Sequence, residues 1–357
     1  MKKVAFVHDR IVTIWWAEKV FMDLINNESF DDAEIFCLFS DKEHLQIWEK
    51  KIKINKVIWN DFIINKIGYR NLMPIFPILN KFMNKQINNY NPDKVVISSF
   101  AIAKNIKTEK YKKLYLHSPM QYIRWSYDEY INKFSWIKKY IYKLTSKYLR
   151  SRDKKFNKYD EIYFNSYYTK KLSNEIYWIN WKVKYPKIKE IYRWIKLEES
   201  YENYYIFIWR LVKFSKELDK IIELFNRNNE FLLVVWTWAD EDELKNKVNW
   251  NIIFLWEIND EFEKIKLITK SKWLINITKE SFWIVTAESL ALGVPVFWYK
   301  DWASCELVDE NSWILVENKD ISSLEKDFYR FSKTNFNRVE IKNNFWKKYD
   351  EIIFHQE

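Results

Sequence analysis

Short apolar runs alternate with longer amphipathic segments along most of this 357-residue chain. Such alternation predicts β-α units, in which crossover helices join parallel strands that are buried on both faces. In the first half of the chain the expected strands are Val4–His8, Ala33–Phe39, Lys53–Ile58, Lys94–Ser98, Lys113–His117 and Glu161–Asn165. In the second half they are Tyr204–Leu211, Phe231–Trp236, Ile252–Trp256, Trp273–Thr278, Pro295–Trp298 and Trp313–Val316. We therefore predict an α/β protein with two successive doubly wound, Rossmann-like sheets.

Helical patterns lie between the strands and define two domains. The expected helices are Ala17–Asn26, Tyr127–Asn157, Glu217–Asn226, Asp240–Val248, Asp260–Thr269, Ile284–Leu292, Ile321–Phe331 and Val339–Phe354. The pattern becomes irregular between Tyr185 and Glu202, which we interpret as a linker. We predict an N-terminal domain over 1–190 and a C-terminal domain over 200–335, with the helical segment 339–357 packing back on the first domain. Doubly wound sheets bind ligands at the carboxyl ends of their strands, so we expect a cleft between the domains.

The most informative motif runs from Lys279 to Val296 and reads KESFWIVTAESLALGVPV. It predicts a strand end, a loop, a buried helix, a turn and another strand. Glu280 falls in the loop and Glu288 in the helix. The free N–H groups at the helix start, near Phe282–Ile284, suit a phosphate. Ionised carboxylates accept hydrogen bonds strongly, so the two glutamates suit sugar and ribose hydroxyls.

This segment closely resembles the donor site of family 4 glycosyltransferases, which have the GT-B fold and carry a Glu-x7-Glu pattern here. That fold consists of two Rossmann-like domains facing across a cleft. The resemblance implies that Glu280 contacts the transferred sugar and that Glu288 binds the nucleotide ribose. An isolated pair of glutamates flanking a core helix would be an ordinary surface feature, but the whole segment matches. The other donor-binding residues that the resemblance implies are Phe282, Trp283, Ile284 and Val285.

A second motif follows the first strand of the second domain and spans Ile208–Asp219. It resembles the Gly-Arg-Leu-Val segment of the same family, which is followed by a lysine. The resemblance gives Arg210 and Lys216 the task of binding the donor diphosphate, with Lys213 as a rival for the lysine. Cations suit this place because the leaving diphosphate gains negative charge as the glycosidic bond breaks.

Two segments of the first domain complete the resemblance. Trp15 and Trp16 stand where the family has a Gly-Gly turn that faces the donor phosphates. Leu114–Tyr122 resembles a His-(Ser/Thr)-Pro-Met segment of bacterial mannosyltransferases of surface polysaccharide synthesis. There the histidine lies near the transferred sugar, which implies a catalytic role for His117. A lone histidine at a strand end is more often structural, and the flanking match favours the site role.

The tryptophans form a pattern of their own. The chain has 20 tryptophans and only 2 glycines, whereas ordinary usage of roughly 7% glycine predicts about 25. Glycine supplies positive φ and close backbone approach, and tryptophan is the bulkiest side chain. We interpret many tryptophans as glycines encoded by UGA, a codon that some bacteria with AT-rich genomes read as glycine. Eleven of them stand where the family or turn chemistry requires glycine: Trp15, Trp16, Trp209, Trp236, Trp238, Trp256, Trp273, Trp283, Trp298, Trp302 and Trp313.

Charge and composition point to the partners. The net charge is +10, which favours an anionic partner, although the lysine excess also fits an AT-rich gene. The segment 131–159 holds ten Lys or Arg and one acid among aromatic and aliphatic residues, which predicts either an anionic membrane surface or a solvated helix face. Only Cys37 and Cys305 are cysteines, and no apolar run is long enough to span a membrane, so we expect a cytoplasmic protein, peripheral at the inner face of the membrane.

The sequence as a whole predicts a retaining glycosyltransferase. It would transfer a hexose, with mannose as the expected sugar, from a nucleoside diphosphate sugar to a glycan or lipid-linked acceptor. The resemblance implies no metal and no cofactor beyond the sugar nucleotide. The main alternative is a catalytically inactive binding module of the same fold, because literal tryptophans would block the donor pocket. A sugar epimerase conflicts with Glu280 and the His117 segment, and a nucleic-acid partner is not expected because no recognition module is present.

Overall fold

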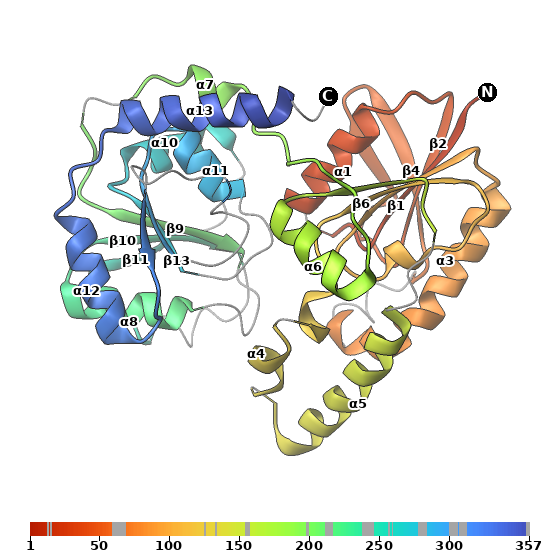
Figure 1. Cartoon of the computed structure of the whole chain (residues 1–357), viewed down its shortest axis with the longest axis horizontal. Coiled ribbons are helices and arrows are strands. Elements are labelled where there is room, and N and C mark those ends of the chain that lie inside the picture. Colours follow the sequence, from red (N-terminus) through yellow and green to blue (C-terminus); the bar gives the residue numbers. More distant parts are fainter. Residues whose placement is uncertain are drawn as a thin grey trace. The chain divides into compact units, whose positions relative to one another are not determined.

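The computed structural model contains two compact units, Met1–Pro186 and Lys187–Glu357 (Figure 1). Each unit is an α/β structure built on its own sheet. The residues that the structure describes are 1–12, 14, 16–58, 69–124, 126–132, 134–153, 158–197, 200–210, 217–237, 246–255, 258, 260–277, 284–299, 306 and 313–354.

The sheet of the first unit has the strand order β3-β4-β2-β1-β5-β6-β7-β8. Its strands are β1 (Lys3–His8), β2 (Asp32–Cys37), β3 (His44–Ile47), β4 (Lys50–Lys56), β5 (Lys94–Ser99), β6 (Tyr111–Leu116), β7 (Glu161–Phe164) and β8 (Lys182–Val183). All neighbouring strands pair in parallel except β3, which forms an antiparallel hairpin with β4 at the sheet edge.

The sheet of the second unit has the order β11-β10-β9-β12-β13-β14 and is parallel throughout. Its strands are β9 (Tyr205–Arg210), β10 (Leu232–Thr237), β11 (Ile252–Leu255), β12 (Leu274–Asn276), β13 (Val296–Tyr299) and β14 (Trp313–Val316). Numbered along the chain, this is the 3-2-1-4-5-6 order of a doubly wound nucleotide-binding sheet. The predicted α/β fold class and all twelve predicted strands are confirmed.

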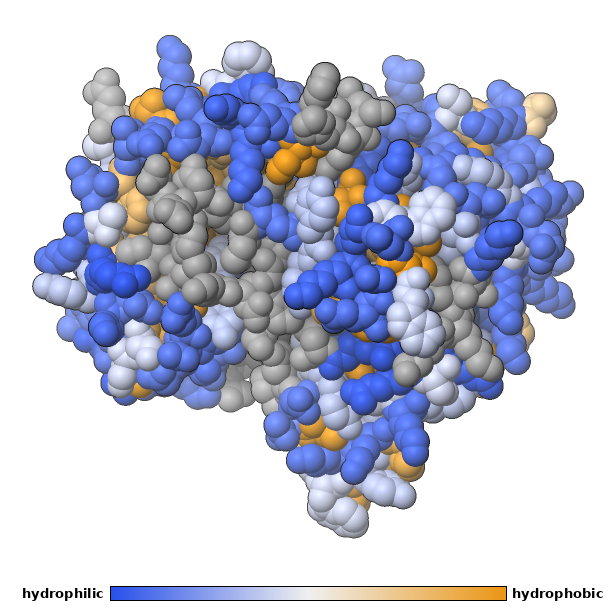
Figure 2. Space-filling model, in the orientation of Figure 1, coloured by the Kyte–Doolittle hydropathy of each residue, from blue (hydrophilic) through white to orange (hydrophobic). Residues whose placement is uncertain are grey.

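The helices pack on these sheets and supply the rest of the two cores. They are α1 (Trp16–Asn26), α3 (Phe76–Tyr90), α4 (Tyr127–Ile131), α5 (Trp136–Asp153), α6 (Tyr167–Tyr177), α7 (Ile191–Trp194), α8 (Leu218–Asn228), α10 (Glu261–Lys270), α11 (Ile284–Ala291), α12 (Ile321–Ser332) and α13 (Arg338–Phe354), with 3-10 turns at Tyr69–Ile75, Ala103–Asn105 and Gln121–Ile123. Apolar side chains are collected inside, as for Phe6 of β1 packed edge-to-face on Phe21 of α1. The visible surface is mostly hydrophilic (Figure 2).

One predicted helix is divided in two in the structure, and another lies mostly outside the described residues. The expected helix Tyr127–Asn157 is wrong as one element, because the structure divides it into α4 and α5. Asn132 ends α4 as its C-cap, and such short polar side chains favour helix ends over helix interiors. The expected helix Asp240–Val248 lies mostly outside the described residues.

The C-terminal helix α13 belongs to the second unit, where it packs against α11. The Trp346 indole donates a hydrogen bond of 3.1 Å to the carbonyl of Ala291, and the Tyr349 hydroxyl accepts one of 2.8 Å from the amide of Ile188. These contacts do not test whether 339–357 also packs on the first domain, which stays a prediction.

Six of the described residues have the left-handed backbone that favours glycine: Trp48, Asn91, Trp178, Glu217, Asn229 and Gly293. Gly293 ends α11 with φ +74°, and a Cβ atom there would lie 2.4 Å from the carbonyl oxygen of Arg338. Trp48 has φ 53° in the two-residue loop between β3 and β4, and Trp178 has φ 57° at the C-cap of α6. Both tryptophan side chains are exposed, at 85% and 88%, so no packing stabilises this backbone.

Candidate functional site

In each sheet, successive strands are added first on one side of the first strand and then on its other side. A doubly wound fold binds its ligand at the point between these two directions. This point lies between β1 and β5 in the first unit and between β9 and β12 in the second. Three predicted motifs follow β1, β9 and β12, and the His117 motif follows β6, the neighbour of β5. Each unit therefore has its own candidate half-site, defined as the residues around its switch point.

The first half-site contains a buried network of hydrogen-bonded polar side chains. The Oγ atom of Ser98, in β5, lies 2.7 Å from Nε2 of His117, which follows β6. Nδ1 of His8, at the end of β1, lies 3.1 Å from the same Oγ and 3.0 Å from the Ser98 carbonyl oxygen. Nε2 of His8 lies 3.8 Å from Oε1 of Glu18 in α1. The rings of His8 and His117 are fully buried.

One of these contacts fixes a proton position on His8. A carbonyl oxygen only accepts hydrogen bonds, so Nδ1 of His8 carries a proton. The Ser98 hydroxyl can then donate its own proton to Nε2 of His117. Burial lowers the pKa of His117 well below its usual range, and the neighbouring His8 lowers it further. The His117 ring is therefore neutral, and its Nδ1 has no hydrogen-bond partner among the described residues.

An aromatic side chain covers this histidine. The Trp16 ring stands edge-on to the His117 ring, with centroids 5.0 Å apart and planes at 83°. Tyr115 contacts another side of the imidazole at 5.1 Å. The structure thus brings together two of the predicted site residues, Trp16 and His117. Trp15, the neighbour of Trp16, lies outside the described residues.

Asp9 organises the loop beside this network and was not predicted as a site residue. Its carboxylate accepts hydrogen bonds from the backbone amides of residues 100–103 and from the Ser99 hydroxyl, at 2.7–3.0 Å. The side chain is almost fully buried. The sequence offered one signal, a charged residue directly after an apolar strand. Its role is to fix the loop after β5 against the end of β1.

The second half-site is described only in part. β9 ends at Arg210, whose side chain lies outside the description, as do Lys213 and Lys216. Glu280 also lies outside it, together with Phe282 and Trp283. The described members of the predicted site are on α11, where Ile284 and Val285 form the first turn and Glu288 the second. Asn276, the last residue of β12, donates a 3.4 Å hydrogen bond to Thr286 of the same helix.

Glu288 is a buried carboxylate with one occupied and one free oxygen. Its Oε1 accepts a 2.9 Å hydrogen bond from the Lys264 ammonium of α10, and its Oε2 has no hydrogen-bond partner among the described residues. Burial alone lowers the pKa of Lys264, but the charges of Glu288 and Glu261 outweigh it and raise that pKa. Lys264 is therefore charged and anchors the Glu288 side chain through Oε1.

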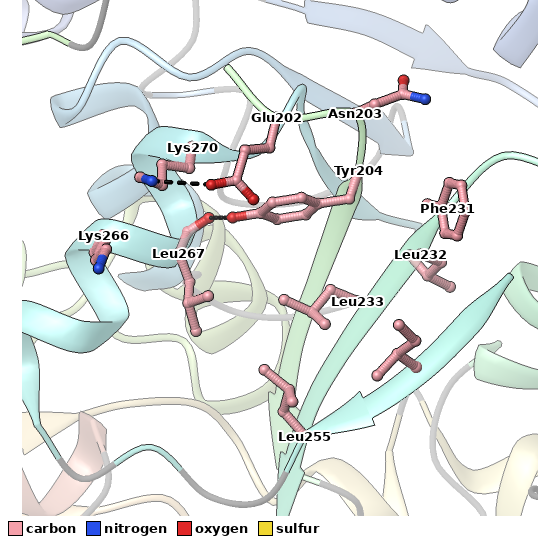
Figure 3. A pocket seen from close by; sticks show the side chains of 11 residues that line it. Glu202, Asn203, Tyr204, Phe231, Leu232, Leu233, Leu255, Lys266, Leu267 and Lys270 are labelled. Carbon is pink, nitrogen blue, oxygen red and sulfur yellow. Dashed lines mark hydrogen bonds and ion pairs between the residues drawn. The ribbon is translucent and has the colours of Figure 1, made fainter. Parts of the chain in front are cut away.

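A cavity of about 490 Å³ in the second unit lies elsewhere (Figure 3). It opens at the amino ends of β9 and β10 beside the last turn of α10. Tyr204 borders it and donates a 2.8 Å hydrogen bond to the Leu267 carbonyl, and Lys270 pairs with Glu202 at 2.9 Å. Ligands of doubly wound sheets bind at the opposite, carboxyl edge, so this cavity lies away from the predicted donor-binding motifs.

Two further features bear on the chemistry. Within the described part of the chain, no cluster of His, Cys, Asp or Glu side chains is placed to hold a metal ion. Its helices include none that combines the length and the apolar composition needed to cross a bilayer.

Known proteins resemble this chain in its second unit by sequence and over both units by fold. The family model of glycosyl transferases group 1 matches residues 188–348. No curated protein matches by sequence. Sucrose-phosphate synthase from Thermosynechococcus elongatus superposes with a TM-score of 0.68 at 10% identity, covering 99% of this chain and 94% of that one.

Two more solved structures show the same likeness. HepE from Anabaena in complex with UDP gives a TM-score of 0.63 at 14% identity, over 98% of this chain and 94% of its own. A UDP-forming α,α-trehalose-phosphate synthase from Burkholderia xenovorans gives 0.64 at 11% identity, over 99% and 95%. Residues 188–348 therefore match the model of glycosyl transferases group 1, and the whole chain has the GT-B fold.

Proposed function

We propose that the protein is a retaining hexosyltransferase. It takes a hexose, with mannose expected, from a nucleoside diphosphate sugar and transfers it to a glycan or lipid-linked acceptor of cell-envelope polysaccharide. The observation that carries this proposal is the topology of the second sheet. The switch point between β9 and β12 is the place where both donor-binding motifs begin, one at Arg210 and the other after Asn276.

The second unit would bind the donor. Arg210 and Lys216 would neutralise the diphosphate, and Glu280 with the amides near Phe282–Ile284 would orient the sugar. The first turn of α11 lies at the positive end of the helix, where an anion is stabilised. Glu288 would hold the ribose, and its partnerless Oε2 supports that role. HepE holds UDP in its crystal structure, which supports a uridine nucleotide as the first donor to test.

The transfer itself would proceed on one face of the sugar. As the bond between the anomeric carbon and the diphosphate oxygen breaks, the acceptor oxygen attacks from the same side and its proton passes to the leaving diphosphate. His117 would line the acceptor side and form a hydrogen bond through Nδ1 with a sugar hydroxyl. The protein supplies position and charge stabilisation, with no metal, cofactor or covalent intermediate.

A donor screen on the full-length protein tests this function. We expect one nucleoside diphosphate to raise the melting temperature, and its sugar conjugate to be consumed in the presence of an acceptor, with and without EDTA. NMR of the first product formed reports the anomeric configuration. The proposal is wrong if no sugar nucleotide stabilises the protein and none is hydrolysed or transferred.

A catalytically inactive binding module is the second candidate, because the Trp16 ring covers His117 when position 16 is a tryptophan. This candidate predicts stabilisation by a nucleotide without turnover. Measuring binding and turnover on the same preparation, with Trp16 and with Trp16→Gly, distinguishes the two. Turnover in the Trp16→Gly protein alone would show that a glycine at this position belongs to the working enzyme.

A further inference from the structure

Helix α5 has two apolar faces on opposite sides. One face packs against the first unit, and its members recur at the spacing of helical turns. These buried residues are Tyr142, Ser146, Leu149 and Asp153. The opposite face repeats with the same spacing but is exposed to solvent at 40–53%. Its members are Ile137, Ile141, Leu144 and Tyr148, with Tyr140 and Trp136 beside them at 63% and 81%.

Cations border this exposed stripe along both of its sides. Between 136 and 152 the helix contains six Lys or Arg residues and no acid. At 3.6 residues per turn, Lys138 and Arg152 lie on one side of the stripe and Lys143 and Lys147 lie on the other. Lys139 and Arg150 lie nearer to the inner face, where the Arg150 guanidinium donates a hydrogen bond to the Ile123 carbonyl. Figure 2 shows orange and pale side chains among blue ones in this part of the molecule.

The inner face holds the helix in place, so the stripe is preformed. Asp153 pairs with the buried Lys104 at 2.7 Å and with Arg124 at 3.0 Å. The Tyr142 ring stacks on Tyr127 of α4 with centroids 5.7 Å apart. Burial raises the pKa of Asp153, but the charge and hydrogen bond of Lys104 outweigh it, so the pKa is lowered and the carboxylate stays ionised.

We propose that the outer face of α5 docks on an anionic lipid bilayer. Isoleucine and leucine side chains would enter the boundary between headgroups and acyl chains, while the bordering lysines bind lipid phosphates. The segment 131–159 was expected to meet either a membrane or solvent, and the exposed stripe favours the membrane. The inference goes beyond the proposed transfer reaction, and its test uses no sugar nucleotide.

The chemistry of the stripe distinguishes a bilayer from other anionic or apolar partners. A nucleic acid would satisfy the lysines but leave the aliphatic centre, Ile141 and Leu144, without a partner. A second copy of the helix would cover the apolar side chains but would bring two sets of cations together with no acid between them. Only an anionic lipid surface offers an apolar interior and a negative border at once.

Vesicle binding by the full-length protein tests the proposal. We expect sedimentation with phosphatidylcholine vesicles that contain phosphatidylglycerol, little sedimentation with pure phosphatidylcholine, and weaker binding as salt is added. The apolar variant is Ile141→Asp with Leu144→Asp, and the charge variant is Lys143→Gln with Lys147→Gln. Each should reduce binding roughly tenfold or more, since one basic residue near an anionic surface contributes about 1 kcal/mol.

The control is Phe262→Asp with Tyr329→Asp, which adds the same charge at exposed aromatic residues of α10 and α12. Its vesicle binding should equal that of the unchanged protein, and circular dichroism should show all variants folded. Equal binding to neutral and anionic vesicles, or unchanged binding of the apolar variant, would overturn the proposal. A shift in oligomeric mass or in RNA retention, with vesicle binding unchanged, would assign the stripe to a second copy or to nucleic acid.

Discussion

At the scale of single residues, two exposed tryptophans carry a backbone that suits glycine. Trp48 occupies a two-residue hairpin loop and Trp178 a helix C-cap, both with positive φ. Hairpin loops of this length and C-caps are the positions at which glycine is most favoured. Neither residue lies in a family motif, so the backbone supports the glycine interpretation independently of the resemblance.

Replacing these residues by glycine should stabilise the protein. The left-handed conformation costs roughly 1–2 kcal/mol for a residue with a Cβ atom, so Trp48→Gly and Trp178→Gly should each raise the free energy of unfolding by about 1 kcal/mol. Urea denaturation measures this. The comparison is Trp194→Gly, a tryptophan that is 76% exposed at the last residue of helix α7 without positive φ, where glycine should give no such gain in stability. Reading the gene gives a second test, since UGG codons at Trp48 and Trp178 contradict the interpretation.

The ring of Trp16 should control access to His117. In the unchanged protein, diethyl pyrocarbonate should modify the exposed His44 and spare the buried His117. Trp16→Gly removes the ring 5.0 Å away and should make His117 reactive. Peptide mass mapping measures both histidines in one sample, with His44 as the internal standard. If His117 stays unreactive in the variant, other side chains bury it and the covering role of Trp16 is wrong.

His117 should also make stability depend on pH. The folded protein keeps this ring neutral because its pKa is lowered, whereas the unfolded chain takes up a proton below about pH 6.5. The unfolded state then binds more protons, so stability falls as the pH falls, by about 1.4 kcal/mol per pH unit. Comparing urea midpoints at about pH 7.5 and about pH 5.5, His117→Gln should lose less stability than the unchanged protein. Equal losses would mean that His117 titrates alike in both states.

At the scale of elements, the junction of α11 and α13 depends on a single glycine. Gly293→Ala places a methyl group 2.4 Å from the Arg338 carbonyl at φ +74°. We expect a loss of at least about 2 kcal/mol in the free energy of unfolding, from backbone strain and displacement of α13. Val294→Ala, a neighbouring buried position in ordinary backbone, serves as the comparison. A loss below that of Val294→Ala would show that α13 moves aside without cost.

The sequence predicts a helix or a strand correctly where burial produces a simple pattern of apolar residues. The parallel strands are buried on both faces, so they appear as apolar runs such as Val4–His8. The hairpin strand β3 was missed because only Leu45 and Ile47 of its four residues are apolar. The link between Ser98 and His117 was also missed. It joins side chains from different strands and leaves no local signal in the sequence, whereas His117 itself was found through its motif.

At the scale of the whole molecule, both sheets contain parallel strands in the order 3-2-1-4-5-6, with the same kind of switch point, and the first sheet adds a strand at each edge. Hydrogen exchange with and without the stabilising nucleotide should therefore slow at the carboxyl edge of the second sheet, in the first turns of α11. Amides around Leu233 and Leu267, which line the cavity at the amino edge, should exchange at unchanged rates. Protection confined to that cavity would place the ligand there and refute the assignment of the donor site.

The Asp9 carboxylate also affects the order of folding. Its bonds join positions 90–94 residues apart, so they can form only after β1 and β5 have paired. Closing so long a stretch of chain is slow compared with forming helices. The hydrogen-bonded network of His8, Ser98 and His117 should therefore be among the last parts of the first unit to form during refolding. An early intermediate would contain most of the helices and still lack this half of the candidate site.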